Sequence, residues 1–218
     1  MTHLETELQL LKTDTIEMWK LVISQLDKTL HSLKSFDKDF SREVVSNEKR
    51  VNSMELKIDR DCENIFALYN PVAVDLRFVL ATLKINNNLE RIGDISEGIS
   101  KFIISEKEPF DKELLKITRF EEMFKAANQI VTDVLHAFEK EDTKLARSIF
   151  EKDEKLDEIN AMANKNIAEF IHKHPQKTEQ ALNVLSIIRR LERVGDQSKN
   201  IAEEIIFYLE AKVLRHIK

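Results

Sequence analysis

The sequence predicts an all-α protein, folded as two tandem, pseudo-symmetric three-helix bundles with six long helices in total. The 218-residue chain has only 3 glycines and 3 prolines, fewer than sandwiches, barrels and doubly wound sheets use in their turns. Apolar residues recur at intervals of three and four along most of the chain, which is the period of one buried helix face. A motif near residue 90 returns 102 residues later, and such a fixed offset indicates duplication of one structural unit.

The first half is expected to hold three helices. In the first of them, apolar residues step by three and four from Ile16 to Leu33. A break at the segment SFDKDFS separates it from a second helix. That helix is expected to end just before Pro71, because proline disfavours the helical conformation of the residue that precedes it. The third helix is expected over residues 72–104.

The second half repeats this plan. The segment around Pro109 has no apolar stripe, so we divide the chain there into residues 1–108 and 109–218. A fifth helix is expected to stop before Pro175, and a sixth to continue to near the end of the chain. Helices of about 30 residues are about 45 Å long, which suits up-and-down bundles with short connections. The fourth helix is predicted from apolar residues at every seventh position, namely Ile117, Phe124, Val131 and Phe138.

Composition excludes several classes of function. The single cysteine, Cys62, rules out an internal disulfide framework and a cysteine-rich zinc module. With a net charge of −5, the chain has no basic field that would hold nucleic acid. No apolar stretch reaches the roughly 20 residues that span a bilayer, and the acidic N-terminal segment is unlike a signal peptide. These observations together indicate a soluble, intracellular protein. We find no phosphate-binding loop, nucleotide fingerprint or nucleophile–base motif, so we expect no enzymatic turnover of phosphate esters or nucleotides.

The repeated motif places two acids and a glycine beside the predicted core of each third helix. It reads LERIGDISEGI at residues 89–99 and LERVGDQSKNI at residues 191–201. The Glu and Asp of each copy lie four residues apart on one helical face, where like charges destabilise a helix by roughly 0.2–0.5 kcal/mol. The glycine between them costs about 1 kcal/mol relative to alanine. Because both halves carry both penalties at the same place, a functional reason is indicated.

The preceding helix of each half supplies that reason. Counting residues outward from each hairpin turn brings further acids opposite the repeated Glu and Asp. The first-half patch then comprises Glu48, Asn52, Glu90 and Asp94, and the second-half patch comprises Asp153, Asp157, Glu192 and Asp196. Clustered carboxylates are hard to keep ionised without a cation, and oxygen ligands suit Mg²⁺, Ca²⁺, Mn²⁺ or ferric iron. The glycine leaves room for an ion or for a close helix, and the first-half patch, with an amide in place of one acid, is expected to bind more weakly.

The competing interpretation is a solvated acidic face paired with Arg91 and Arg193. The chain has 39 acidic residues, and most acid pairs at helical spacing lie on solvated faces. Glu55 and Asp59 are interpreted as such a surface pair, because the position opposite them, near Thr82, carries no charge. For the two patches we favour a cation site, because the pairs are duplicated and face further acids.

LERIGD, LERVGD, the segment PVAVDLR at residues 71–77 and the duplicated three-helix plan together resemble the PhoU family of bacterial phosphate-transport accessory proteins. The resemblance covers essentially the whole chain. It implies a negative regulator of the phosphate-starvation response that restrains phosphate uptake. Such a protein acts through contacts with a phosphate-specific ABC transporter, both permease and ATPase, and with a membrane sensor histidine kinase. It also implies a homodimer that reaches the membrane only through its partners and binds no nucleic acid.

The resemblance further implies metal binding, because family members hold multinuclear iron or zinc clusters through acid-x-x-x-Asp motifs. Those motifs match Glu90/Asp94, Glu192/Asp196 and Asp153/Asp157 in this sequence. The pair Glu48/Asn52 departs from the pattern, which puts metal loading of the first half in question.

A carboxylate-bridged, metal-dependent helical-bundle enzyme is the alternative function. Such enzymes need inward-facing acid-x-x-His pairs, and Asp133/His136 and Glu169/His172 have that spacing. We expect both pairs at the surface, because the first lies off the apolar face of its helix and His172 lies at a helix end.

Overall fold

A computed structural model describes residues 2–214 of the chain. Within these residues the backbone is almost entirely helical, and the predicted all-α class is confirmed. The elements are α1 (His3–Ser35), α2 (Lys38–Tyr69), α3 (Ala73–Ser105), α4 (Lys112–Ile117), α5 (Phe120–Lys140), α6 (Thr143–Lys173), the 3₁₀ turn η1 (Pro175–Lys177) and α7 (Thr178–Glu210). The described helices contain no segment long and apolar enough to cross a membrane.

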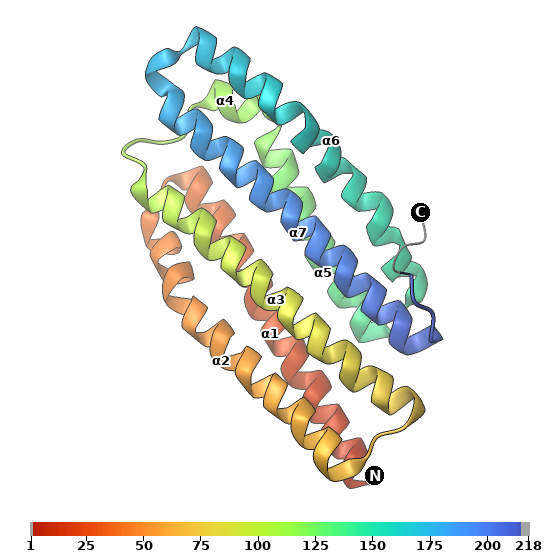
Figure 1. Cartoon of the computed structure of the whole chain (residues 1–218). Helices are drawn as coiled ribbons and strands as arrows, with labels where there is room; N and C mark the ends of the chain where they lie inside the picture. The colour runs from red at the N-terminus through yellow and green to blue at the C-terminus, as the bar shows by residue number, and fades with distance from the viewer. Residues whose placement is uncertain (1, 215–218) are drawn as a thin grey trace.

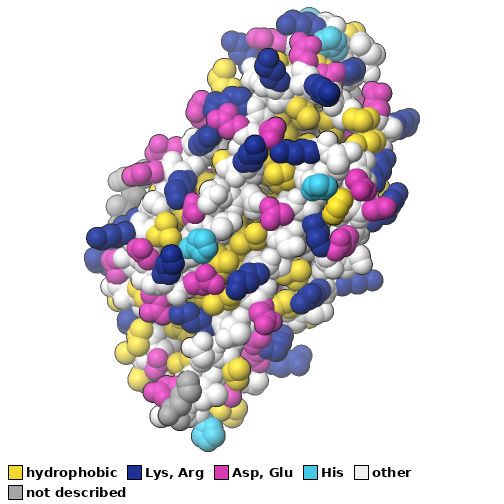
Figure 2. Space-filling view, turned by 180° about the vertical axis from the view of Figure 1, so that it is seen from behind, with side chains coloured by type: hydrophobic (Ala, Val, Ile, Leu, Met, Phe, Trp, Pro, Cys, Tyr) yellow, Lys and Arg dark blue, Asp and Glu magenta, His cyan; other side chains and the backbone are white. Residues whose placement is uncertain are grey.

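The long helices form two three-helix units that lie side by side. Figure 1 shows α3 and α7 adjacent along the middle of the molecule, with α2 on one flank and α6 on the other. Helices α1 and α5 lie behind them and also contact each other. On the face turned away in Figure 1, acidic and basic side chains are interspersed, with apolar side chains scattered between them (Figure 2).

Two hairpin turns lie where proline predicted them. Helix α2 ends at Tyr69, and Asn70 follows in the left-handed conformation with φ 45°, directly before Pro71. Helix α6 ends at Lys173, and Pro175 begins the 3₁₀ turn that leads into α7. These turns make α2–α3 and α6–α7 antiparallel hairpins, which is the arrangement on which both acidic patches depend.

The predicted fourth helix is wrong as a single element. It is interrupted between Ile117, the last residue of α4, and Phe120, the first residue of α5. The Thr118 hydroxyl donates to the carbonyl of Leu114 at 2.7 Å, and Arg119 adopts the left-handed conformation with φ 51°. Threonine competes for backbone hydrogen bonds in this way, so a helix can end here without glycine or proline.

One hydrophobic core runs through both units. The indole Nε1 of Trp19 on α1 donates to the carbonyl of Val131 on α5 at 3.1 Å, and the Trp19 ring lies 5.6 Å from the Phe138 ring. Near the N-terminal end of α3, Arg77 Nε donates to the carbonyl of Tyr208 on α7 at 3.1 Å, and the Tyr208 ring lies 6.3 Å from the same Phe138 ring. The two units are therefore joined by buried packing and by hydrogen bonds, which fixes α3 against α7.

Glycines in the repeated motif allow each hairpin to close tightly. A Cβ built on Gly195 would lie 1.9 Å from Asp153 Oδ1 and 2.7 Å from Leu156 Cδ1. A Cβ on Gly93 would meet Val51 Cγ1 at 3.2 Å, which a small shift can relieve. The motif glycine therefore lets the two helices of a hairpin approach each other closely. A side chain at this position would clash in the second hairpin, whereas a small shift would accommodate it in the first.

We predict that Gly195→Ala destabilises the protein by about 1–3 kcal/mol, because the new methyl group overlaps a buried carboxylate and a leucine. Gly93→Ala is the matched control and should change stability by less than about 1 kcal/mol, since better helix propensity offsets the tight contact. Urea denaturation of both variants measures the difference. Equal stability of the two variants would contradict this account of the hairpins.

Candidate functional site

Each acidic patch is built around one buried carboxylate from the earlier helix of its hairpin. Glu48 on α2 is 6% exposed, and Asp153 on α6 is 1% exposed. Both point at the motif glycine of the following helix: Glu48 Oε2 lies 3.4 Å from the Cβ position of Gly93, and Asp153 is in direct contact with that of Gly195. Burying a carboxylate is unfavourable unless it is paired or neutralised, so the two patches pose the same electrostatic problem.

The second-half patch contains its own cation. Lys199 Nζ forms an ion pair with Asp153 and lies 2.9 Å from Asp196 Oδ1. Burial raises the pKa of Asp153, and the Lys199 ammonium opposes that rise. Burial alone would lower the pKa of Lys199, but Asp153 and Asp196 raise it above its usual range. The buried acid is therefore neutralised by a lysine of the neighbouring helix, which the sequence analysis missed.

All four acids predicted for the second half share this patch. Burial raises the pKa of Glu192, and Asp196, Asp157 and Asp153 raise it further through their charges. Asp196 stands 45% exposed beside the lysine, so the patch opens to solvent on the side of α7. The sequence prediction that these carboxylates converge is consistent with this geometry, whereas the need for an added metal is reduced by Lys199.

The first-half patch holds a buried acid without a cation. Neither carboxylate oxygen of Glu48 forms a hydrogen bond of good geometry among the described residues, although the buried Gln25 amide beside it lowers the pKa of Glu48. Burial, followed by the charges of Asp94 and Glu97, raises the pKa of Glu48 to about 7. The 102-residue offset places Glu97 where the second half has Lys199, so the built-in cation is replaced by a further acid.

The other predicted members of the first-half patch divide into two groups. Glu90 belongs to it: burial raises its pKa, and the charges of Asp94 and Glu55 add to the rise. Asn52 is exposed, and no hydrogen bond within residues 2–214 connects it to the patch.

Glu55 and Asp59, interpreted above as a solvated surface pair, are corrected by the structure. Asn86 Nδ2 donates to the Glu55 carbonyl at 2.9 Å and to Asp59 Oδ1 at 2.8 Å, and Asn86 itself is fully buried. Asp59 therefore takes part in the α2–α3 contact through its carboxylate, while Glu55 does so through its backbone carbonyl. The charges of Glu55 and Glu90 act on each other, so Glu55 extends the negative charge of the first-half patch.

Asp133, the acid of the acid–histidine motif on α5, forms an ion pair with a lysine of α6. Asp133 Oδ2 lies 2.7 Å from Lys152 Nζ, and Gln129 donates to the other carboxylate oxygen at 2.9 Å. Asp133 is thus half-buried between α5 and α6 rather than fully solvated. Its contacts stabilise the packing of these two helices.

The fit of the two patches to a metal ion differs. Among residues 2–214, no three Asp, Glu, His or Cys side chains already form a set that could hold a metal ion. In the second half, the Lys199 ammonium stands between the carboxylates that would be ligands. In the first half, the buried Glu48 carboxylate faces Glu90 and Asp94, and mutual repulsion keeps such groups apart until a cation joins them. The donor set of the first half therefore suits a cation better.

Comparison with known proteins gives a consistent result. The family model described as the PhoU domain matches residues 15–103 and again residues 120–205. A relative from Thermotoga maritima, named phosphate-specific transport system accessory protein PhoU homolog 1, is 34% identical over 216 residues, 98% of this chain and 91% of the relative.

Two solved structures share the fold over nearly their whole length. The crystal structure of PhoU from Pseudomonas aeruginosa has a TM-score of 0.89 and 27% identity, covering 95% of this chain and 99% of that one. The crystal structure of the phosphate transport system regulatory protein PhoU from Streptococcus pneumoniae has a TM-score of 0.86 and 28% identity. The match covers 97% of this chain and 99% of that one.

We predict that Lys199→Met destabilises the protein by on the order of 3 kcal/mol at about pH 8, because it leaves Asp153 buried without its partner. The loss should be smaller at about pH 5. An acid whose folded pKa is raised destabilises the fold increasingly as pH rises through that pKa, and removing the lysine raises the pKa of Asp153 further. Urea denaturation at both pH values measures the change, with Lys165→Met on the exposed face of α6 as the control. A loss that is the same at both pH values would contradict the assigned role of Lys199.

Proposed function

This chain belongs to the PhoU family, and from that premise we propose that it is an accessory regulator of phosphate transport. In this proposal it restrains high-affinity phosphate uptake and holds the phosphate-starvation response off when phosphate is plentiful. The observation that carries the proposal is the double match to the PhoU domain, which includes both copies of the repeated motif. The names of the relatives support it, since they describe accessory and regulatory proteins of phosphate transport systems.

The proposed activity is protein contact rather than catalysis. Its partners would be the ATPase and permease of a phosphate ABC transporter and a sensor histidine kinase, with the protein acting in the cytoplasm as a homodimer. Exposed apolar side chains at the α2–α3 corner support a contact role: Leu68 and Val72 are each 70% exposed, and Val74 is 49% exposed. Apolar residues grouped on a surface in this way mark interaction sites.

We also propose that the first-half patch takes a cation, with Glu48, Glu90 and Asp94 as its ligands. Iron and zinc follow from the family, and Mg²⁺, Mn²⁺ or Ca²⁺ from the oxygen donors. The bound ion would neutralise the buried Glu48 and hold α2 against α3. We expect this patch to bind a metal ion more tightly than the second-half patch, because Lys199 already supplies a cation to the second-half patch. This order is the reverse of the one that the replacement of an acid by Asn52 predicts.

Deleting the gene in its host tests the regulatory proposal. A phosphate-starvation reporter should remain active at high phosphate in the deletion strain, and the wild-type gene should restore repression. The double variant Leu68→Asp/Val72→Asp should fail to restore it, because charge disrupts an apolar contact. Leu56→Asp, at a 64% exposed position elsewhere on α2, should restore it and serves as the control. Normal repression in the deletion strain would overturn the proposal.

A further inference from the structure

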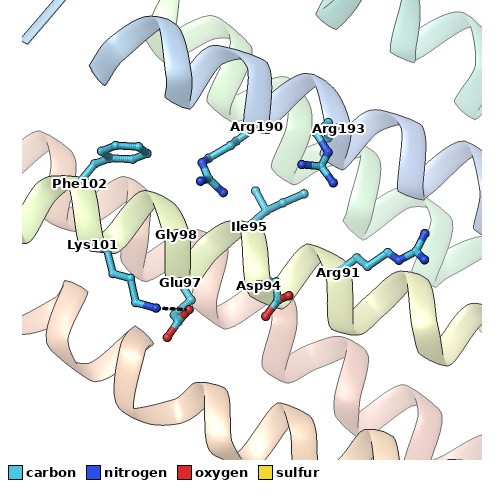
Figure 3. Close-up of a pocket in the computed structure, with 9 residues that line it drawn as sticks. All are labelled: Arg91, Asp94, Ile95, Glu97, Gly98, Lys101, Phe102, Arg190 and Arg193. Atoms are coloured by element: carbon cyan, nitrogen blue, oxygen red, sulfur yellow. Dashed lines mark hydrogen bonds and ion pairs between the residues drawn. The ribbon is translucent and has the colours of Figure 1, made fainter. Parts of the chain in front are cut away.

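A groove with more basic than acidic side chains lies between α3 and α7, next to the first-half patch. Its cavity of about 560 Å³ is lined by Arg91 and Lys101 of α3 and by Arg190 and Arg193 of α7. Figure 3 shows Arg190 and Arg193 reaching from α7 toward α3, and Asp94 and Glu97 at the α2 side of the same groove, so that four cations and two acids line it. The groove therefore presents cations from both halves of the chain at the junction of the two units.

Three of these cations have no anionic partner. Lys101 Nζ pairs with Glu97 Oε2 at 2.7 Å. Among residues 2–214, the guanidinium groups of Arg91, Arg190 and Arg193 form no ion pair or side-chain hydrogen bond. Neither Arg91 nor Arg193 forms a direct ion pair with the acidic patches among these residues, although the charge of Arg91 lowers the pKa of Glu90. Three unpaired guanidinium groups around one cavity leave a local excess of positive charge on a chain whose net charge is −5.

The position of Arg190 is fixed by two residues of α3. Its guanidinium carbon lies 5.4 Å from the centre of the Phe102 ring, a distance at which a cation is attracted to the aromatic face. A Cβ built on Gly98 would lie 2.6 Å from Arg190 Nη1. The absence of a side chain at position 98 therefore makes the space that the guanidinium occupies.

The pseudo-symmetric counterpart of this groove is a cavity of about 590 Å³ lined by one arginine, Arg91, and by Glu203 at the position related to Lys101. The 102-residue offset relates Arg190 to Asn88 and Gly98 to Asn200, and these two asparagines meet through a side-chain hydrogen bond of 3.4 Å. Beside them, Lys84 Nζ pairs with Glu204 Oε2 at 3.0 Å. Packing α3 on α7 therefore does not require an arginine at position 190, because Asn88 at the related position packs without one.

We propose that this groove binds a small molecule carrying at least two linked phosphoryl groups. A planar guanidinium group can donate two parallel hydrogen bonds to phosphoryl oxygens. Three guanidinium groups around one cavity favour a single ligand with several negative charges over a ligand with one carboxylate. The cavity volume falls within the range of about 300–1,000 Å³ that is usual for small-molecule sites, which leaves room for more than one phosphoryl group. The proposal is independent of the regulatory function proposed above.

Calorimetric titration of the purified full chain, at about 150 mM salt to suppress unspecific attraction, tests the proposal. The probes are pyrophosphate, ATP and inorganic phosphate. Pyrophosphate and ATP should bind with one site per chain and more tightly than inorganic phosphate. Arg190→Gln should weaken pyrophosphate binding about tenfold or more, since it removes a charged hydrogen-bond donor.

Two further variants separate the site from general charge. Gly98→Ala changes no charge and favours the helix, yet it should weaken pyrophosphate binding several-fold by displacing Arg190. Arg189→Gln removes one positive charge from α7 outside the groove, where Arg189 donates to Asn164 at 3.0 Å, and it should leave binding unchanged. Thermal melting confirms that each variant is folded.

Several outcomes would overturn the proposal. These are the absence of pyrophosphate and ATP binding, inorganic phosphate binding as tightly as pyrophosphate, an equal loss in Arg189→Gln, or unchanged affinity in Gly98→Ala. Tighter binding of an acidic peptide such as oligoglutamate than of pyrophosphate would assign the groove to a protein partner and would also overturn it.

Discussion

In each hairpin of this protein, a glycine of the later helix leaves room for a buried carboxylate of the earlier helix. Asp153 meets Gly195 between α6 and α7, and Glu48 meets Gly93 between α2 and α3. The glycine lets the two helices approach closely, but the approach removes a carboxylate from water, which is unfavourable without a compensating charge. The polar features of both hairpins follow from how that charge is compensated.

The two halves compensate it in different ways. In the second half, Lys199 pairs with Asp153 and Asp196 and so supplies a compensating charge, although Asp153 Oδ1 has no hydrogen-bond partner among the described residues. In the first half, Glu97 stands in the place of that lysine and adds negative charge. The α3–α7 junction shows the same divergence, since Asn88 and Asn200 meet on one side of it, where the other side has Arg190 and Gly98. A duplicated backbone thus carries two different charge patterns.

The sequence predicted what local chemistry determines. Pro71 and Pro175 stop helices wherever they stand, and the repeat revealed the duplicated plan and the acids of both patches. The break at Thr118 was not predicted, because it depends on a side-chain hydrogen bond without glycine or proline. The 102-residue offset also relates Glu97 to Lys199. The importance of that difference depends on the burial of Glu48 and Asp153, which the sequence does not show. The basic groove could not be predicted, since it exists only where α3 packs on α7, and that packing depends on the apolar faces of both units.

The central claim is that the first-half patch needs an external cation and the second-half patch does not. Anomalous scattering from crystals of the full chain grown with Mn²⁺ tests it most directly, because the experiment locates the ions. The account predicts anomalous density beside Glu48 and Asp94, with Lys199 still paired with Asp153. Density between Asp153 and Asp196 with Lys199 displaced, and none beside Glu48, would contradict it.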